Sequence, residues 1–152
     1  MDIKIARANK DDASDILELQ KIAYQKEATL YDNWTIPLLT QTLSEIQTEF
    51  EKSFFLKALW NARIVGSVKG FIDFGTCKIG RLIVHPDYQR KGIGALLMKN
   101  IETSFPNAKR FELFTGTKSV DNIRLYQKLG YGEYGQQDLS QKVRIAFMEK
   151  LK

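Results

Sequence analysis

The sequence predicts a single mixed α/β domain over residues 1–152, with one central sheet and helices packed against it. Strand and helix patterns follow one another in the order β-α-α-β-β-β-α-β-α-β-β, and such a mixture in a chain of this size implies helices layered on one sheet. A length of 152 residues suits one domain that buries a core without disulfides or metals. The composition, 43% hydrophobic and 27% charged, is that of a globular protein rather than a disordered one.

The first third of the chain predicts one strand and two helices. Residues 3–7 alternate between apolar and polar side chains, as a half-buried strand does. The stretch 11–24 opens with two aspartates that can cap a helix, and it then repeats apolar residues at intervals of three and four. A turn-like pair at 32–33 follows, and a proline in the first turn opens a second helix over 37–50.

The middle of the chain predicts three strands. Residues 53–60 and 63–74 are rich in aromatic and β-branched side chains, and Asn61-Ala62 between them predicts a hairpin. A glycine turn then leads to a third strand over 78–84, which a proline ends.

The last third predicts two helices and three strands. A helix over 92–104 begins at two glycines, and a short strand over 110–115 follows it. Residues 119–129 place apolar side chains on one helical face, and the glycine after them is a good terminating residue. Strands over 131–134 and 143–151 complete the chain.

The charge balance leaves several kinds of partner open. Lys and Arg number 23 against 18 Asp and Glu, and the net charge of +5 suits nucleic acid, a membrane surface or a small anionic ligand. The sequence has no RNP aromatics, zinc ligands or basic helix, so we expect no nucleic acid partner. It also lacks a signal-peptide pattern and an apolar run of about eighteen residues, so we expect no membrane partner and a cytoplasmic location.

The single cysteine and the single histidine limit redox and metal chemistry. Cys77 cannot form an internal disulfide, and its type predicts a partly buried small hydrophobe. His85 is the one histidine of the sequence, which excludes a multi-histidine zinc site, so we expect no metal.

Segment 81–97 is the part of the sequence best suited to chemistry. A strand ends there, a polar loop follows, and Gly92 and Gly94 open a helix. The first turn of a helix has N–H groups without internal partners and a partial positive charge, and glycines let an anion approach them closely. Arg90 and Lys91 add two cations, which suits a pyrophosphate. The sequence has no GxxxxGK[ST] P-loop, and it lacks the third glycine of a dinucleotide-binding GxGxxG.

This loop, Gln89-Arg90-Lys91-Gly92-Ile93-Gly94, resembles the Q/R-x-x-G-x-G/A motif of the GCN5-related N-acetyltransferases, which cradles the pyrophosphate of acetyl-CoA. A second family motif is matched where Asn122 opens a helix, Tyr126 follows and Gly130-Tyr131 ends it. The order of elements also matches the family fold over essentially the whole chain. The resemblance implies one mostly antiparallel sheet with helices on both faces.

The resemblance further implies acetyl-CoA as co-substrate, in a gap where the strand at 82–84 splays from the strand at 111–115. An open strand edge can pair with the amides of the pantetheine arm, so Leu82 and Val84 would contribute main-chain contacts, and Asn122 would contact the same arm. The residues that the resemblance places around the cofactor are Leu82, Ile83, Val84, Gln89, Arg90, Lys91, Gly92, Ile93, Gly94, Ala95, Asn122 and Tyr126.

The activity that the resemblance implies is transfer of an acetyl group to a primary amine of a small molecule or peptide, by direct attack in a ternary complex. Tyr126 is similar to the family tyrosine that hydrogen-bonds the CoA sulfur and protonates the leaving thiolate. A phenol with a pKa of about 10 can donate to a thiolate whose thiol has a pKa of about 8.5. Tyr126 also falls on the apolar face of its helix, so a purely structural role is the alternative.

The sequence leaves the general base open. Relatives carry acidic residues on the strand before the pyrophosphate loop, whereas this chain has Lys78 and Arg81 among the corresponding positions. Asp73, Glu112 or a chain of waters could replace them. His85 titrates in a useful range, but its place before a proline favours a spacer role.

The acceptor is also left open. Arg81 would repel a polyamine and attract a carboxylate or phosphate, which predicts an acceptor with an anionic group; the alternative is a solvated strand residue. The connection 24–34 is expected to form either a wall of the acceptor site or a lid packed on the core. The candidate acceptor residues are Tyr31, Trp34, Asp73 and Arg81.

Two further alternatives stand beside this interpretation. A CoA-binding module of the same fold that has lost catalysis, and acts as a sensor or structural partner, would also explain the missing acidic base. The family often forms dimers through its C-terminal strands, whose edges invite pairing, so a homodimer stays open.

Overall fold

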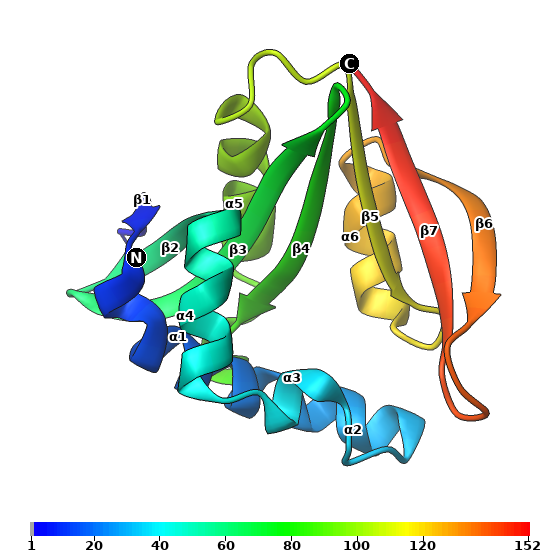
Figure 1. The fold of residues 1–152 in the computed structure, drawn as a ribbon, viewed down its shortest axis with the longest axis horizontal. Coiled ribbons are helices and arrows are strands. Elements are labelled where there is room, and N and C mark those ends of the chain that lie inside the picture. The colour runs from blue at the N-terminus through cyan, green and yellow to red at the C-terminus, as the bar shows by residue number, and fades with distance from the viewer. Residues whose placement is uncertain (1) are drawn as a thin grey trace.

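The computed structural model describes residues 2–152, which form one seven-stranded sheet with helices around it (Figure 1). The strands are β1 (Lys4–Ala8), β2 (Phe54–Trp60), β3 (Arg63–Asp73), β4 (Thr76–Val84), β5 (Arg110–Gly116), β6 (Gly132–Asp138) and β7 (Arg144–Leu151). The helices are η1 (Lys10–Asp12), α1 (Ala13–Ala23), α2 (Gln25–Tyr31), α3 (Pro37–Thr40), α4 (Leu43–Lys52), η2 (Pro86–Tyr88), α5 (Ile93–Thr103) and α6 (Val120–Lys128).

The strands lie in the order β1-β2-β3-β4-β5-β7-β6. Every neighbouring pair is antiparallel except β4 and β5, which are parallel. The predicted single, mostly antiparallel sheet is therefore confirmed.

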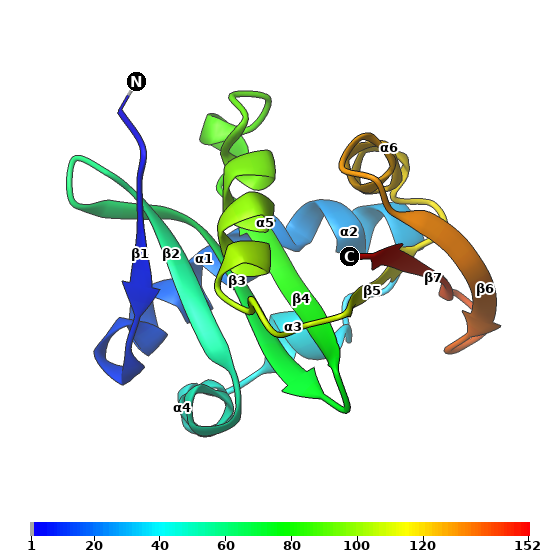
Figure 2. The same ribbon diagram turned by 90° about the horizontal axis from the view of Figure 1, so that it is seen from above.

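Helices cover both faces of the sheet, as predicted (Figure 2). α5 packs against β2, β3 and β4 and buries Ile93, Leu97, Met98 and Ile101 in the larger core. α1 and α4 lie on the opposite face, where a smaller core joins Ile16 and Ile46 to Phe55. Because each helix presents an apolar stripe to the sheet, burial of that stripe is the main stabilisation of each layer.

The segment between α1 and β2 differs from the prediction of one helix over 37–50. It holds three helices, because Thr42 is extended and ends the stripe between α3 and α4. Thr42 Oγ1 accepts from the N–H of Glu45 at 3.2 Å, and the Glu45 carboxylate accepts from the N–H of Thr42 at 2.9 Å. This reciprocal capping box starts α4 at Leu43. The predicted connection 24–34 contains α2, which ends where Asp32 adopts a left-handed φ of 48°.

The predicted hairpin turn at Asn61-Ala62 is confirmed, with φ of 50° and 65°, as a two-residue turn of the I′ type needs. The turn predicted at Gly75-Thr76 lies one residue earlier, at Phe74-Gly75, because Thr76 already belongs to β4. β6 extends four residues beyond the predicted 131–134. It is the edge strand and is almost entirely solvent-exposed, so it has no apolar alternation by which to recognise it.

One feature of the sheet positions the site: β4 and β5 pair over a short length and then diverge. Thr76–Lys78 pair with Arg110–Glu112, and the strands separate beyond that point (Figure 1). The predicted splay of 82–84 from 111–115 is thus confirmed. β4 also carries an irregularity at Arg81, whose φ is 54°. We call the space between β4 from Ile79 and β5 from Leu113 the opening.

Candidate active site

The start of α5 is built to receive an anion at the wide end of the opening. Gly92, the N-cap residue, has a φ of 82° and Arg90 one of 62°, so the backbone turns through two left-handed positions before the helix. No side chain caps α5, which leaves its first N–H groups free for a ligand. A Cβ on Gly94 would lie 3.3 Å from the Leu125 side chain, so glycine there allows close packing of α5 on α6.

The side chains of this loop divide into exposed and structural ones. Arg90 and Lys91 are exposed, and neither forms an ion pair with any residue that the structure describes. Gln89 Nε2 donates to the Val84 carbonyl at 3.2 Å, which ties the loop to the end of β4. The Ile93 side chain is buried in the core, so only its main chain can meet a ligand.

His85 has a structural place, in agreement with the predicted spacer role. Its Nδ1 accepts from the N–H of Asp87 at 3.1 Å and so caps η2. Tyr88 follows and packs against both His85 and Trp60, with ring centroids 5.6 and 5.5 Å apart. These contacts fix the chain just before residues 89–94, which we call the anion loop.

Tyr126 lies on the buried face of α6. Its ring packs against Tyr131 with centroids 6.1 Å apart. Burial raises the pKa of the Tyr126 phenol, and the neighbouring Tyr24 and Glu27 raise it further, so the hydroxyl keeps its proton at neutral pH. Asn122 lies one turn earlier and is half-buried. The hydroxyl is therefore available as a hydrogen-bond donor.

α2 meets α6 at the wide end of the opening. Tyr24, Glu27 and Tyr31 recur at intervals of three and four and share one side of this helical stretch. The Ser119 hydroxyl donates to Glu27 Oε2 at 2.7 Å and lies 2.9 Å from the Tyr31 hydroxyl, which also accepts from the N–H of Lys118 at 3.0 Å. Burial and the Glu27 charge raise the pKa of Tyr24 to about 12 against the opposing effect of Arg81.

The two candidate aromatic residues of 24–34 have different places. Tyr31 is 5% exposed and packs on Gly116, at the end of β5, where any Cβ would collide with the Tyr31 ring and hydroxyl. This corresponds to the predicted lid packed on the core. Trp34 is 59% exposed, which leaves it free for the predicted wall of an acceptor site.

We expect Gly116→Ala to lower the free energy of unfolding by about 1–2 kcal/mol, because the added methyl group displaces Tyr31 and with it the end of α2. Urea unfolding followed by circular dichroism measures the loss. Gly132→Ala is the matched control, since a Cβ there meets no atom within 4 Å. Equal midpoints for the two variants would contradict the packing of Tyr31 on Gly116.

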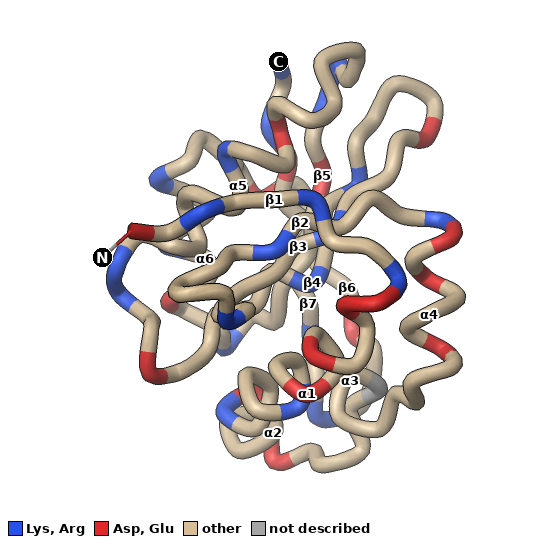
Figure 3. The backbone as a smooth tube through the Cα atoms, turned by 90° about the vertical axis from the view of Figure 1, so that its left-hand side faces the viewer, with Lys and Arg blue, Asp and Glu red and all other residues tan. Residues whose placement is uncertain are grey.

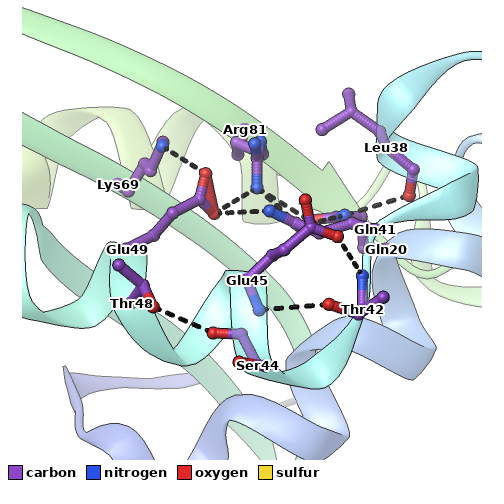
Figure 4. A network of polar contacts seen from close by, with 10 residues as sticks. All are labelled: Gln20, Leu38, Gln41, Thr42, Ser44, Glu45, Thr48, Glu49, Lys69 and Arg81. Atoms are coloured by element: carbon purple, nitrogen blue, oxygen red, sulfur yellow. Dashed lines mark hydrogen bonds and ion pairs between the residues drawn. The ribbon is translucent and has the colours of Figure 1, made fainter.

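Arg81 is held in a polar network rather than left free in the opening (Figure 4). Its guanidinium donates to Glu49 Oε2 at 2.6 Å and to Gln41 Oε1 at 2.9 Å, and Lys69 Nζ lies 3.2 Å from Glu49 Oε1. The side chains of Arg81 and Glu49 are 18% and 22% exposed. Arg81 is therefore not the solvated strand residue of the alternative interpretation. Its charge is balanced by Glu49, so an anionic acceptor remains a prediction that this network does not support.

The carboxylates considered as general base lie at the narrow end of β4. Asp73, beside the β3–β4 turn, is 3.5 Å from Lys78 Nζ. Glu112 is at the last paired position of β5 and forms an ion pair with Arg110. Neither is among the groups that shift the pKa of Tyr126. The carboxylate whose charge raises that pKa is Glu27. Glu27 was not among the candidates predicted from the sequence, although its three- and four-residue spacing from Tyr24 and Tyr31 marks a shared helical face.

The remaining sequence expectations concern charge, cysteine, metal and membrane. Figure 3 shows Lys and Arg interspersed with Asp and Glu along the chain. Cys77 is buried, more fully than predicted, and burial raises the pKa of its thiol to about 12. Within residues 2–152, no group of three or more His, Cys, Asp and Glu could hold a metal ion. None of the described helices is long and apolar enough to cross a membrane.

Comparison with known sequences gives two matches. Residues 14–131 match the family described as "Acetyltransferase (GNAT) family". The UPF0157 protein YqkA of Bacillus subtilis strain 168 is 30% identical over 119 residues, which are 78% of this chain and 34% of that protein. The chain therefore spans about a third of the length of this curated relative.

Comparison with solved structures shows the same fold in proteins of low identity. The PaiA N-acetyltransferase of Thermoplasma acidophilum, in complex with coenzyme A, has a TM-score of 0.82 and 18% identity, with complete coverage of both chains. YncA of Salmonella typhimurium with its cofactor acetyl-CoA has a TM-score of 0.77 and 18% identity, over 99% and 94% of the two chains. The ribosomal-protein-S18-alanine N-acetyltransferase of Escherichia coli has a TM-score of 0.75 and 15% identity over the same shares.

Proposed function

Since the chain belongs to the acetyltransferase (GNAT) family, we propose that it transfers an acetyl group from acetyl-CoA to a primary amine of a small molecule or peptide. The proposal rests on one observation: three features lie along the same opening. The uncapped start of α5 lies at its wide end, the unpaired edge of β4 runs along it, and α6, which carries the buried Tyr126, lies beside it (Figure 1).

The chain's own residues fit this co-substrate. The first N–H groups of α5, with Arg90 and Lys91 beside them, offer a pyrophosphate both main-chain donors and opposite charge. The unpaired edge of β4 at Leu82 and Val84 offers main-chain groups to an amide-bearing arm, and Asn122 adds a side-chain amide. Two-ended binding of this kind would direct the thioester along β4 into the opening.

The reaction then needs the amine as a nucleophile and a partner for the thiolate. The amine nitrogen attacks the thioester carbonyl carbon in a ternary complex, a C–N bond forms and the C–S bond breaks. Tyr126 donates its hydroxyl hydrogen to the departing sulfur, and the nitrogen loses a proton that restores the phenol. One further proton, which the ammonium form of the amine loses before attack, goes to solvent in each turnover.

The test is release of free thiol from acetyl-CoA with spermidine, L-lysinamide, L-alaninamide and glycine as acceptors, together with detection of the N-acetyl product by mass spectrometry. We expect thiol release that depends on amine and matches the acetylated product mole for mole. Tight binding of acetyl-CoA with no thiol release from any amine would contradict the proposal and favour a silent CoA-binding module.

A second expected result concerns the anion loop. Replacing Arg90 and Lys91 together with alanine should raise the KM for acetyl-CoA roughly tenfold at low ionic strength, with kcat almost unchanged, because the two cations act on binding alone. The difference should shrink in 0.5 M salt, where a screening length of roughly 4 Å weakens exposed charges. Lys99→Ala, an exposed lysine later in α5, is the control. An equal effect of Lys99→Ala would indicate long-range charge rather than a site.

A further inference from the structure

The contact between α2 and α6 places a carboxylate at the wide end of the opening. Glu27 Oε2 accepts the Ser119 hydroxyl at 2.7 Å. Ser119 is the N-cap residue of α6, and Tyr126 follows seven residues later, so both lie on one face of that helix after two turns. Both are buried. Glu27 therefore lies on the face of α6 that carries the proposed hydrogen-bond donor.

The Glu27 carboxylate is not neutralised by an ion pair with a described residue. Among the residues described, no lysine or arginine forms an ion pair with it. Two other carboxylates described above are neutralised by ion pairs. Glu49 pairs with Arg81 and Lys69, and Glu112 pairs with Arg110. A half-buried carboxylate with one hydroxyl donor keeps lone pairs for a cationic ligand.

Among the described residues, the group that hydrogen-bonds the Glu27 carboxylate is the Ser119 hydroxyl rather than a cation. Its charge is felt by Tyr24 and by Tyr126, whose pKa values it helps to raise. The titratable phenols that face Glu27 are Tyr24 and Tyr31 on its own helical stretch and Tyr126 on α6. The charged groups on the packed elements are Lys118 over the Tyr31 ring, the exposed pair Lys26–Asp121, and Arg81 of β4 beyond Tyr24. An ammonium entering here meets one unpaired carboxylate.

We propose that Glu27 is a catalytic residue of this chain: it binds the acceptor ammonium in the opening and takes its proton, and Ser119 positions the carboxylate. The assignment rests on the function proposed above. The ammonium gives one proton to Glu27, which passes it to solvent, and the neutral nitrogen attacks the thioester carbonyl carbon. As the C–S bond breaks, Tyr126 gives its proton to sulfur, and the second proton lost by nitrogen returns to the Tyr126 oxygen.

The acceptor that fits this arrangement is an amine that arrives charged, with no carboxylate next to the reacting nitrogen. An α-amino acid would bring its own carboxylate towards Glu27, and two like charges at such a distance repel each other. We therefore expect L-lysinamide and spermidine to be better acceptors than glycine in the wild-type protein. Faster acetylation of glycine would overturn this part of the proposal.

The test compares Glu27→Gln with Asp32→Asn, using the panel amine that gives the fastest thiol release. Glutamine keeps an oxygen that can accept from Ser119, so the fold should be retained. Asp32 is an exposed carboxylate just past the end of α2, and asparagine suits its left-handed backbone. At pH 7.5 we expect Glu27→Gln to lower kcat/KM for the amine about 100-fold, and Asp32→Asn to leave it within twofold.

Two further readouts separate catalysis from structure. The KM for acetyl-CoA and the thermal midpoint of Glu27→Gln should match those of Asp32→Asn. Its defect in kcat/KM should shrink towards pH 9.5, where the free amine needs no base, whereas a structural defect would stay constant. Ser119→Ala should give a several-fold loss with the same pH trend.

The outcomes of this comparison distinguish the two proposals. If the wild type acetylates an amine and Glu27→Gln equals Asp32→Asn, or its defect is independent of pH, the Glu27 assignment is wrong while the function stands. If the wild type acetylates no amine, the function itself is contradicted and the assignment falls with it.

Discussion

Tyr126→Phe is expected to lower kcat roughly 100- to 1000-fold while the KM for acetyl-CoA stays within about twofold. The change removes one hydroxyl from a buried ring and leaves its packing against Tyr131 in place. The lost interaction is one that strengthens as sulfur becomes negative, so it acts on the transition state more than on binding. Steady-state rates with acetyl-CoA and the fastest amine of the panel measure the effect.

Because the pKa of Tyr126 is raised, the group that donates to sulfur is the neutral phenol. A phenol held above its ordinary pKa remains protonated throughout the neutral range, so it donates without first needing a proton. In the proposed reaction the thiolate would leave into the same buried environment, which would disfavour its negative charge as well. We therefore expect the rate of the wild type to show no loss of activity assignable to Tyr126 ionisation below pH 10.

Tyr131→Phe is the matched control for this prediction. Tyr131 is also buried, packs against Tyr126, and donates its hydroxyl to Glu102 at 2.7 Å rather than facing the opening. Its loss should reduce stability, since Glu102 then keeps only Lys150, without a large change in kcat. If the two variants lose kcat equally, Tyr126 is part of the core and does not act on sulfur.

The second large effect is expected at Glu49. Glu49→Ala should lower the free energy of unfolding by about 3 kcal/mol, because it leaves Arg81 and Lys69 as like charges with no anion between them, each side chain 18% exposed. For a chain of this size that corresponds to a fall of roughly 10 °C in Tm. Thermal and urea unfolding measure the change.

Lys69→Met is the control that separates loss of the Glu49–Arg81 ion pair from loss of any charge in the network. Burial and the Arg81 charge lower the pKa of Lys69, whereas Glu49 raises it, and the net pKa lies below its usual value. The charged form of Lys69 is therefore disfavoured at this position. Replacing it should cost less than about 1 kcal/mol, because Arg81 still balances Glu49. A cost equal to that of Glu49→Ala would contradict a network organised around the Glu49–Arg81 pair.

The pH dependence of stability tests the same network. Burial raises the pKa of Glu49, but Arg81, Gln41 and Lys69 outweigh it, and the net pKa lies below its usual value. A carboxyl with a lowered native pKa contributes stability above its unfolded pKa of about 4.3 and loses it as pH falls through the native value. The wild type and Glu49→Ala should therefore differ most above pH 5 and converge below pH 4.

Local sequence signals account for what could be predicted. The hairpin at Asn61-Ala62, the glycine start of α5 and the apolar face of α6 each depend on residues close together in the chain. The same is true of the resemblance that placed Tyr126, because its two motifs are short and separately readable. The capping box of Thr42 and Glu45 was also local and readable, so the single helix expected over 37–50 is an avoidable error.

Long-range pairing accounts for what could not be predicted. Arg81 and Glu49 lie 32 positions apart, and no periodicity in either segment says that the two charges meet. The same holds for Glu27 and Ser119, which are 92 positions apart and meet only in the folded chain. The sequence therefore predicted an acceptor contact for Arg81 and a base on the neighbouring strands, whereas the base that we propose, Glu27, lies on α2.

A crystal structure with acetyl-CoA bound tests the central claim most directly. We expect the pyrophosphate at the first N–H groups of α5, the pantetheine arm along the free edge of β4, and the sulfur within hydrogen-bonding distance of the Tyr126 hydroxyl. A pyrophosphate bound elsewhere, or a sulfur directed away from Tyr126, would contradict the placement of acetyl transfer in the opening between β4 and β5.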